Sequence, residues 1–271
     1  MKEALRIILP AFALAAAVLA GAAHGQATEQ ARRAFFAVES DPFEQDAVQA
    51  AMRELEAAHK GDPTNPWVLI AMSRLFLEKG YIQGDRSQRR AYRARDLKDA
   101  EVHARQALEL APEDPMAHVQ VARLQIIAGD HGAAWETLDK ARELDPNDFY
   151  PWYYRGVISL KANDAKRAAS NLDTALTRAV MPFQKEWVVD RRIDVARLNR
   201  DVAEEERLHK ELIAMSPASS HHYGNYALFL RKLKRYDEAI EQYRKAIAIR
   251  PYRIAREQLE QTLRLRNAAR R

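Results

Sequence analysis

Apolar residues recur along the chain with the spacing of an α-helix, and the recurrence is itself repeated. Before Pro112, small or apolar residues stand 12, 8 and 5 positions back. The sets that share this pattern are Ala51, Leu55 and Ala58; Ala100, Ala104 and Ala107; Ala134, Leu138 and Ala141; Ala168, Leu172 and Ala175; and Ala239, Tyr243 and Ala246. Because small residues at this spacing let two helices approach closely, each set predicts a helix packed tightly against another helix.

Prolines follow four of these sets, whereas Val180 stands at that place after Ala175, and the prolines together with Pro217 give the length of the repeating unit. Pro112 and Pro146 are 34 residues apart, and so are Pro217 and Pro251. The interval from Pro63 to Pro112 is 49 residues, which fits one unit of 34 with an insertion of 15. A proline cannot continue a helix, so each marks the end of a unit.

The first half of each unit is also predicted to be helical. Trp152 is followed four positions later by Gly156, a large and a small residue on one helical face. Gly80, Gly129 and Asn163 stand at matching places further along, where a left-handed residue would end the helix. Each unit is therefore predicted to be a helix, a short turn and a second helix.

These units resemble tetratricopeptide repeats. The copy at 218–251 carries the family's pattern of large, small and proline positions in Tyr223, Ala227, Tyr236, Ala239, Tyr243, Ala246 and Pro251. The resemblance implies an all-α fold, a right-handed α-solenoid of antiparallel helix pairs with about five repeats and terminal capping helices.

The pattern divides the chain into consecutive segments. They are a signal peptide at 1–25, N-terminal helices with a partial repeat at 26–63, a repeat at 64–112 with an insertion near 82–97, repeats at 113–146 and 147–182, a degenerate repeat at 183–217, a repeat at 218–251 and a capping helix at 252–271.

The N-terminus has the layout of a secretory signal. Lys2 and Arg6 precede an apolar run over 7–20, and small residues then allow cleavage after Ala22 or Gly25. The alternative is an uncleaved anchor, but the run is shorter than the roughly 20 residues that a spanning helix needs. The chain has no cysteine, which excludes disulfides and a lipid-modified cysteine. We expect a periplasmic or secreted protein.

Charge and motifs give little support for catalysis. Basic residues number 43 against 38 acidic ones, so the net charge of +5 does not by itself indicate a nucleic-acid partner. Phosphate-binding, dinucleotide-binding and nucleophile-elbow motifs are absent from the sequence. The eight histidines form no metal-ligand pattern. The sequence therefore predicts a non-enzymatic protein without metal or cofactor.

The resemblance implies that the first helices of successive repeats line a concave groove that binds a partner segment. By position, the residues expected to line this groove are Trp67, Arg74, Met116, Gln120, Arg123, Tyr150, Tyr153, Tyr154, Asn225 and Arg231. Aromatic residues and arginines of this kind suit protein recognition. The alternative is that several of them pack between helices, since an error of one position turns a side chain by about 100°.

The insertion is a second candidate surface. It carries Arg86, Arg89, Arg90 and Arg93, which would share one face of a helix and could contact an acidic partner or an anionic membrane surface. The alternative is a solvated basic loop.

Together these features favour a scaffold or adaptor of the cell envelope that holds a segment of another protein in the groove. An alternative is a component of an exported-polysaccharide or envelope-assembly machinery that binds an anionic polymer. A third is a subunit of an enzyme whose active site lies on another chain. We expect no nucleic-acid partner, because export separates the chain from nucleic acid.

Overall fold

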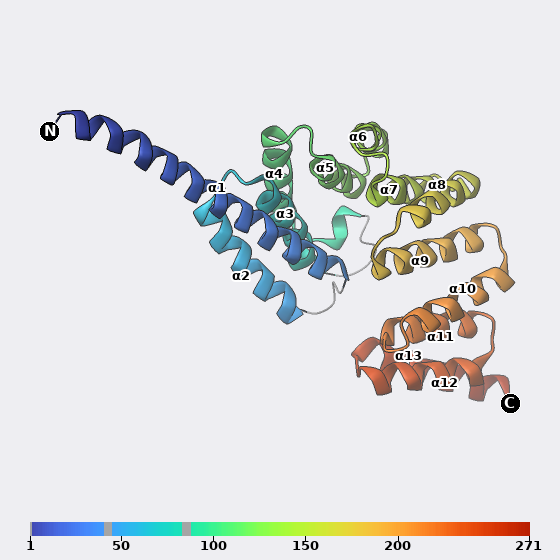
Figure 1. Ribbon diagram of the computed structural model, residues 1–271. Helices are drawn as coiled ribbons and strands as arrows, with labels where there is room; N and C mark the ends of the chain where they lie inside the picture. The colour runs from blue at the N-terminus through green and yellow to red at the C-terminus, as the bar shows by residue number, and fades with distance from the viewer. Residues whose placement is uncertain (1, 41–44, 83–87) are drawn as a thin grey trace. The chain divides into compact units, whose positions relative to one another are not determined.

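The computed structural model describes residues 2–40, 45–82 and 88–271, and within these ranges it leaves the side chains of 2–20, 45–47 and 90 undescribed. The described residues are helical apart from turns and one isolated bridge between Tyr81 and Tyr92, which confirms the all-α prediction (Figure 1). The helices are α1 (Lys2–Ser40), α2 (Gln45–Gly61), α3 (Pro66–Gly80), α4 (Ala94–Leu110), α5 (Pro115–Ala128), α6 (His131–Leu144), α7 (Phe149–Lys161), α8 (Ala165–Arg178), α9 (Pro182–Leu198), α10 (Val202–Met215), α11 (Ser220–Lys232), α12 (Tyr236–Ile249) and α13 (Arg253–Ala269), with a short 3₁₀ turn η1 (Arg89–Ala91).

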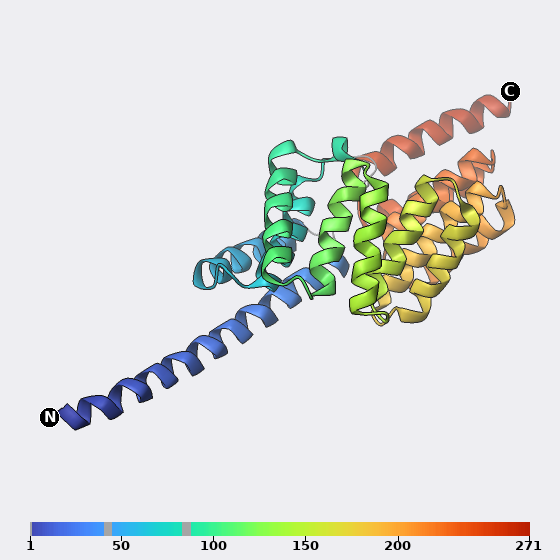
Figure 2. The same cartoon turned by 90° about the horizontal axis from the view of Figure 1, so that it is seen from above.

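The helices fall into two compact units that divide within α7. Unit 1 covers Met1–Tyr154 and unit 2 covers Arg155–Arg271. In unit 1, α3 packs against α4 and α5 against α6, while α1 packs against α2 and α3 (Figure 2). In unit 2, α9 packs against α10, α11 against α12, and α13 against α12. Consecutive helix pairs are the architecture of an α-solenoid, as the sequence predicts.

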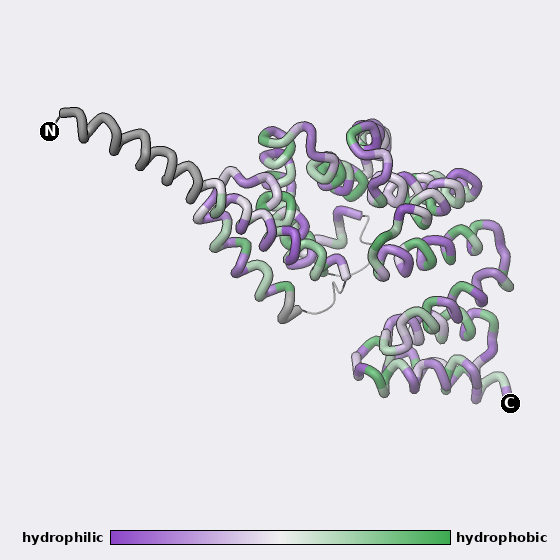
Figure 3. Tube along the Cα trace, viewed as in Figure 1, coloured by the Kyte–Doolittle hydropathy of each residue, from purple (hydrophilic) through white to green (hydrophobic). Residues whose placement is uncertain are grey.

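Small residues bring the paired helices together. Hydrophobic and hydrophilic positions alternate around the helices (Figure 3), and the alanine and leucine sets of the repeats lie on the buried side. Ala100, Ala104 and Ala107 of α4 are fully buried, as are the corresponding sets of α6 and α8. Because interiors are close-packed, the small positions fix how near the facing helix can lie.

The helix ends follow from local chemistry. The side chains that accept hydrogen bonds from first-turn backbone N–H groups are Asn65 for α3, Asp114 for α5, Asp130 for α6, Asp164 for α8 and Asp201 for α10. Such side chains satisfy donors that a helix leaves unpaired at its start. At the other end, Gly129 and Asn163 are left-handed, with φ of 87° and 56°, as predicted.

Gly80 differs from this prediction. It lies within α3 and is not left-handed. A Cβ atom at this position would lie 2.7 Å from Cβ of Asp96 at the start of α4. The glycine is therefore needed for the close approach of α4 and not for a left-handed helix end.

The segment that follows Gly80 is not one continuous helix. Tyr81 bridges Tyr92, η1 covers Arg89–Ala91, and α4 begins at Ala94. Tyr92 and Leu97 are buried in the core of the α3–α4 pair. Within the described residues, no helix combines the length and the apolar character that a membrane crossing needs.

Candidate functional site

The C-terminal part of α1 packs along the first helices of unit 1. Residues 21–26 are exposed, and Ala27 is the first buried residue among those of α1 whose side chains are described. The buried residues of α1 are Ala27, Ala31, Ala34, Phe35, Val38 and Glu39. Their spacing of three and four places them on one face of the helix. Phe35 meets the edge of Trp67 on α3 and of Tyr150 on α7, with ring centroids 6.3 and 6.2 Å apart.

The last buried residue on this face of α1 is a carboxylate, Glu39. Glu39 is fully buried, and its Oε1 accepts hydrogen bonds from Nε of Arg74 and, at 2.9 Å, from Nη1 of Arg123. Arg74 also donates to Glu78, and Nε of Arg123 donates to the Tyr154 hydroxyl. Helices α1, α3, α5 and α7 thus converge on one network of two carboxylates, two guanidinium groups and a phenol.

Burial and charge both affect this network. Burial alone would lower the pKa of Arg74 and of Arg123, but Glu39, together with Glu78 beside Arg74 and Tyr154 beside Arg123, raises both pKa values above the usual range. Burial raises the pKa of Tyr154, so the phenol stays protonated. The pair of arginines therefore remains charged, and a carboxylate is the natural counterion for this position.

The predicted groove residues of unit 1 lie on α3, α5 and α7, and four of them contact α1, namely Trp67, Arg74, Arg123 and Tyr150. The buried ones are Arg74, Met116, Gln120, Arg123, Tyr150 and Tyr154, and the half-buried ones are Trp67 and Tyr153. Gln120 is fully buried, and neither polar atom of its amide has a hydrogen-bond partner among the described residues. In this structure the chain's own helix occupies the face that the sequence analysis assigned to a partner.

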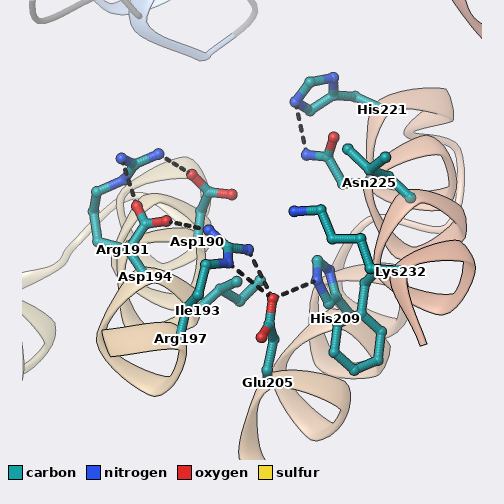
Figure 4. Close-up of a pocket in the computed structure, with 12 residues that line it drawn as sticks. Asp190, Arg191, Ile193, Asp194, Arg197, Glu205, His209, His221, Asn225 and Lys232 are labelled. Carbon is teal, nitrogen blue, oxygen red and sulfur yellow. Dashed lines mark hydrogen bonds and ion pairs between the residues drawn. The ribbon is translucent and has the colours of Figure 1, made fainter. Parts of the chain in front are cut away.

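In unit 2 the corresponding face holds a pocket of about 290 Å³ (Figure 4). Its lining residues are Asp190, Arg191, Ile193, Asp194 and Arg197 of α9, Glu205 and His209 of α10, and His221, Asn225, Leu228, Phe229 and Lys232 of α11. Asn225, a predicted groove residue, lines this pocket and its amide lies 3.0 Å from Nε2 of His221.

The acidic side chains of the pocket are already paired. Nη1 of Arg191 lies 2.9 Å from Asp194, and Arg197 contacts Asp194 and Glu205 at 2.8 Å each. Arg191 also pairs with Asp190. Lys232 is exposed and makes no ion pair among the described residues, and Figure 4 shows its amine directed into the pocket. The unpaired charge that the pocket offers a ligand is therefore positive.

His209 forms part of the floor of this pocket. It is buried, its Nε2 has no hydrogen-bond partner among the described residues, and Glu205 lies 4.0 Å away. Burial lowers the pKa of His209 to about 4, against the opposing effect of the Glu205 carboxylate. The ring is thus neutral near pH 7 and adds no charge to the pocket.

The remaining predicted residues belong neither to the network around Glu39 nor to the pocket of unit 2. Arg231 donates from Nη1 to Gln258 and Gln261 of α13. Arg89 is exposed and lies 3.7 Å from Glu101, and Arg93 donates to Asp96 at 2.8 Å. Arg86 and the side chain of Arg90 lie outside the described residues. The described arginines of the insertion thus pair within the chain.

Two important residues were not among the sequence candidates. Glu39 gave no local signal, because its partners Arg74 and Arg123 are distant in sequence. Lys232 directly follows Arg231 on α11, so the same first-helix register could have included it had both sides of the helix been considered.

The arrangement is suited to binding. Its polar groups are paired or displayed around the first helices of a helix-pair array, which is the geometry of an α-solenoid binding protein. Residues 222–253 match the family model described as tetratricopeptide repeat. The chain thus carries a tetratricopeptide repeat at 222–253 within an array of helix pairs.

Solved structures share the fold. The crystal structure of the APC/C hetero-tetramer Cut9–Hcn1 aligns with a TM-score of 0.64 and 16% identity, over 80% of this chain and 40% of that one. Yeast Tom70 aligns with a TM-score of 0.51 and 18% identity, over 75% of this chain and 39% of that one. The chain thus spans about 40% of the length of these two relatives. None of the curated proteins matches the chain by sequence.

Proposed function

We propose that this protein is a non-catalytic scaffold of the cell envelope that holds segments of partner proteins on the first helices of its repeats. The tetratricopeptide fold is that of protein-interaction scaffolds. The observation that carries the proposal is the contrast between the units: the face in unit 1 already holds a helix, whereas the face in unit 2 leaves a polar pocket.

The partner segment for the pocket of unit 2 is acidic. Lys232 offers the unpaired positive charge, and Asn225 offers an amide that can bond to a peptide backbone or side chain. The carboxylates of the pocket are paired with Arg191 and Arg197, whereas Lys232 makes no ion pair among the described residues. A carboxylate on the partner would therefore gain a charge-assisted hydrogen bond.

A photocrosslinking residue at position 225 in producing cells would test this function. We expect it to capture a protein partner, whereas the same residue at Glu241, exposed on α12, should not. With the captured partner purified, Lys232→Gln should weaken binding by roughly tenfold, since a hydrogen bond to a charged group contributes about 1.5 kcal/mol. The matched control Lys245→Gln removes an exposed lysine of α12 and should leave binding unchanged.

Equal capture at both positions, or equal binding by both lysine variants, would contradict the proposal. Displacement by an anionic polysaccharide, with no protein captured, would instead support the polymer-binding function.

We further propose that the protein is exported with its signal removed. The distribution of burial supports a cut after Ala22 or Gly25, because residues 21–26 are exposed and either cut leaves the buried face from Ala27 to Glu39 intact. The mass of the chain recovered from the envelope fraction tests this. A full-length chain, or a chain confined to the cytoplasm, would contradict it.

A further inference from the structure

Within unit 1, α1 contacts the first helices through a stripe of apolar side chains and one buried carboxylate, Glu39. Ala27, Ala31, Ala34, Phe35 and Val38 are buried along the stripe, and the flanking Glu29, Arg33 and Ala37 are exposed. Phe35 contacts Trp67 and Tyr150, and the guanidinium of Arg32 lies 4.5 Å from the Trp67 ring centroid. This is how an amphipathic helix binds in the groove of another protein.

The charge of the face without α1 is positive. Arg74 would keep its partner Glu78, whereas the hydrogen-bond partners of Arg123 among the described residues are Glu39 and the phenol of Tyr154. Since the phenol is neutral, removal of Glu39 leaves Arg123 without a carboxylate. A carboxylate placed between Arg74 and Arg123 is therefore required of any helix that occupies this face.

The fit of α1 is incomplete at the same place. Oε2 of Glu39 is buried and has no hydrogen-bond partner among the described residues. Gln120 lies three residues before Arg123 on α5 and therefore on the same side of that helix, and both polar atoms of its buried amide likewise have no partner among the described residues. Buried polar atoms without partners weaken the docking of α1, and a helix that reached them would bind more tightly.

A helix of this length also has little stability of its own. The docked part covers about four turns, and isolated helices of about 15 residues are marginal in water. This segment therefore depends on its packing against α2 and α3 and on the contacts of Glu39 with α5 and of Phe35 with α7. If residues 26–40 detached, Arg74 and Arg123 would be exposed to water. Hydration would then replace Glu39 as the stabilising partner of their charges, so the detached state does not contain a buried, unpaired arginine.

We propose that residues 26–40 are an exchangeable internal ligand, and that the partner of unit 1 is an amphipathic helix that presents a carboxylate between Arg74 and Arg123. The inference rests on the scaffold function proposed above and assigns the partner chemistry of unit 1. A helix with the same stripe and carboxylate displaces the internal one by competing for Phe35's contacts and for the two guanidinium groups.

The probe for this proposal is a labelled peptide that copies residues 26–40, added to the full-length chain. In the Glu39→Gln chain the internal helix loses its charge, so the face should be open for a larger fraction of the time and the peptide should bind about tenfold more tightly than to wild type. Glu29→Gln is the matched control, because it makes the same change on the exposed side of α1. A peptide carrying Glu39→Gln should not gain this affinity.

Equal binding of the peptide to all three chains, or equal binding of the two peptides to the Glu39→Gln chain, would overturn the proposal. Hydrogen exchange on the wild-type chain gives a second test that needs no variant. Amides of 27–40 should exchange through openings that leave α3 and α5 protected, and identical protection of all three segments would also overturn it. These outcomes concern unit 1 alone, so capture of a partner at position 225 would remain evidence for the scaffold function if they fail.

Discussion

The side chain of His209 combines deep burial with an ionisable ring, and this makes unit 2 sensitive to acid. The ordinary pKa of 6.5 applies in the unfolded chain, whereas burial lowers the folded value to about 4. Between these values the unfolded state binds a proton that the folded state does not. The stability of unit 2 is therefore complete above pH 6.5 and falls as the pH decreases toward 4.

We predict that His209→Leu flattens this dependence. The unfolding free energy of wild type should decrease by up to roughly 3 kcal/mol across that window, while the variant should lose clearly less, because it has no ring to protonate. Chemical denaturation at a series of pH values, followed by circular dichroism, measures both. His131→Leu, a change in unit 1, should keep the wild-type slope, and an unchanged slope in His209→Leu would refute the assignment.

Gly156 shows how closely two helices of a repeat approach. A Cβ atom at this position would lie 2.9 Å from both Cγ and Cδ2 of Leu172, which is fully buried on α8. Gly156→Ala gains about 1 kcal/mol of helix propensity but forces Leu172 to move in a packed core, at a cost of about 1–3 kcal/mol. We predict net destabilisation in thermal or denaturant unfolding.

Gly132→Ala is the comparison for that variant. A Cβ atom there meets only an oxygen of Asp130, at 3.9 Å, so the propensity gain should remain and the chain should become slightly more stable. Stabilisation by both alanines would mean that α7 and α8 approach less closely than the structure has them.

At the scale of elements, α13 closes the stack in unit 2. Ala255 and Thr262 are its buried residues, and Arg231 of α11 donates to Gln258 and Gln261. An end helix of this kind covers the apolar side of the last repeat and presents a polar side to solvent. Arg231, expected from sequence to line a binding groove, contributes here to attaching the end helix.

We predict that Arg231→Ala destabilises unit 2 by about 1–2 kcal/mol through the loss of these two hydrogen bonds. Arg244→Ala removes an exposed arginine of α12 and should have little effect. Denaturant midpoints of the two variants give the comparison, and equal midpoints would show that the contacts with Gln258 and Gln261 add nothing.

The elements themselves could be predicted because their signals are local. The alanines before each proline, and Asn163 and Gly129 at helix ends, depend on residues a few positions apart, and the structure confirms both. Gly80 was misinterpreted because a close approach to Asp96 and a left-handed turn both select glycine. The docking of α1 could not be predicted, since the stripe around Phe35 shows that one side is buried but not which helix covers it.

At the scale of the whole molecule, burial divides α1 at Ala27. Among the residues with described side chains, removing residues 1–25 takes away the contacts of His24, which lies 2.6 Å from Asp62 and whose carbonyl oxygen accepts a hydrogen bond from Asn65 at 3.2 Å. This truncation should change the unfolding free energy by no more than about 1–2 kcal/mol. Removing residues 1–40 takes away Phe35, Val38 and Glu39 and should cost at least roughly 3 kcal/mol.

Calorimetry of the full-length chain and both truncations tests this difference. Equal stability of the two truncations would contradict the seating of α1 on α3. A large loss on removal of residues 1–25 would instead mean that the exposed part of α1 is structural, and it would weaken the case for signal cleavage.

The bond between Glu39 and Arg123 spans 84 residues in a chain whose other contacts are mostly between neighbouring helices. Repeat arrays generally assemble stepwise, each module adding to the last. Here α1 must wait for α5, and for the tyrosines of α7, before it makes all its contacts. Unit 1 is thus expected to complete its folding in one concerted event, and only after α7 has been synthesised.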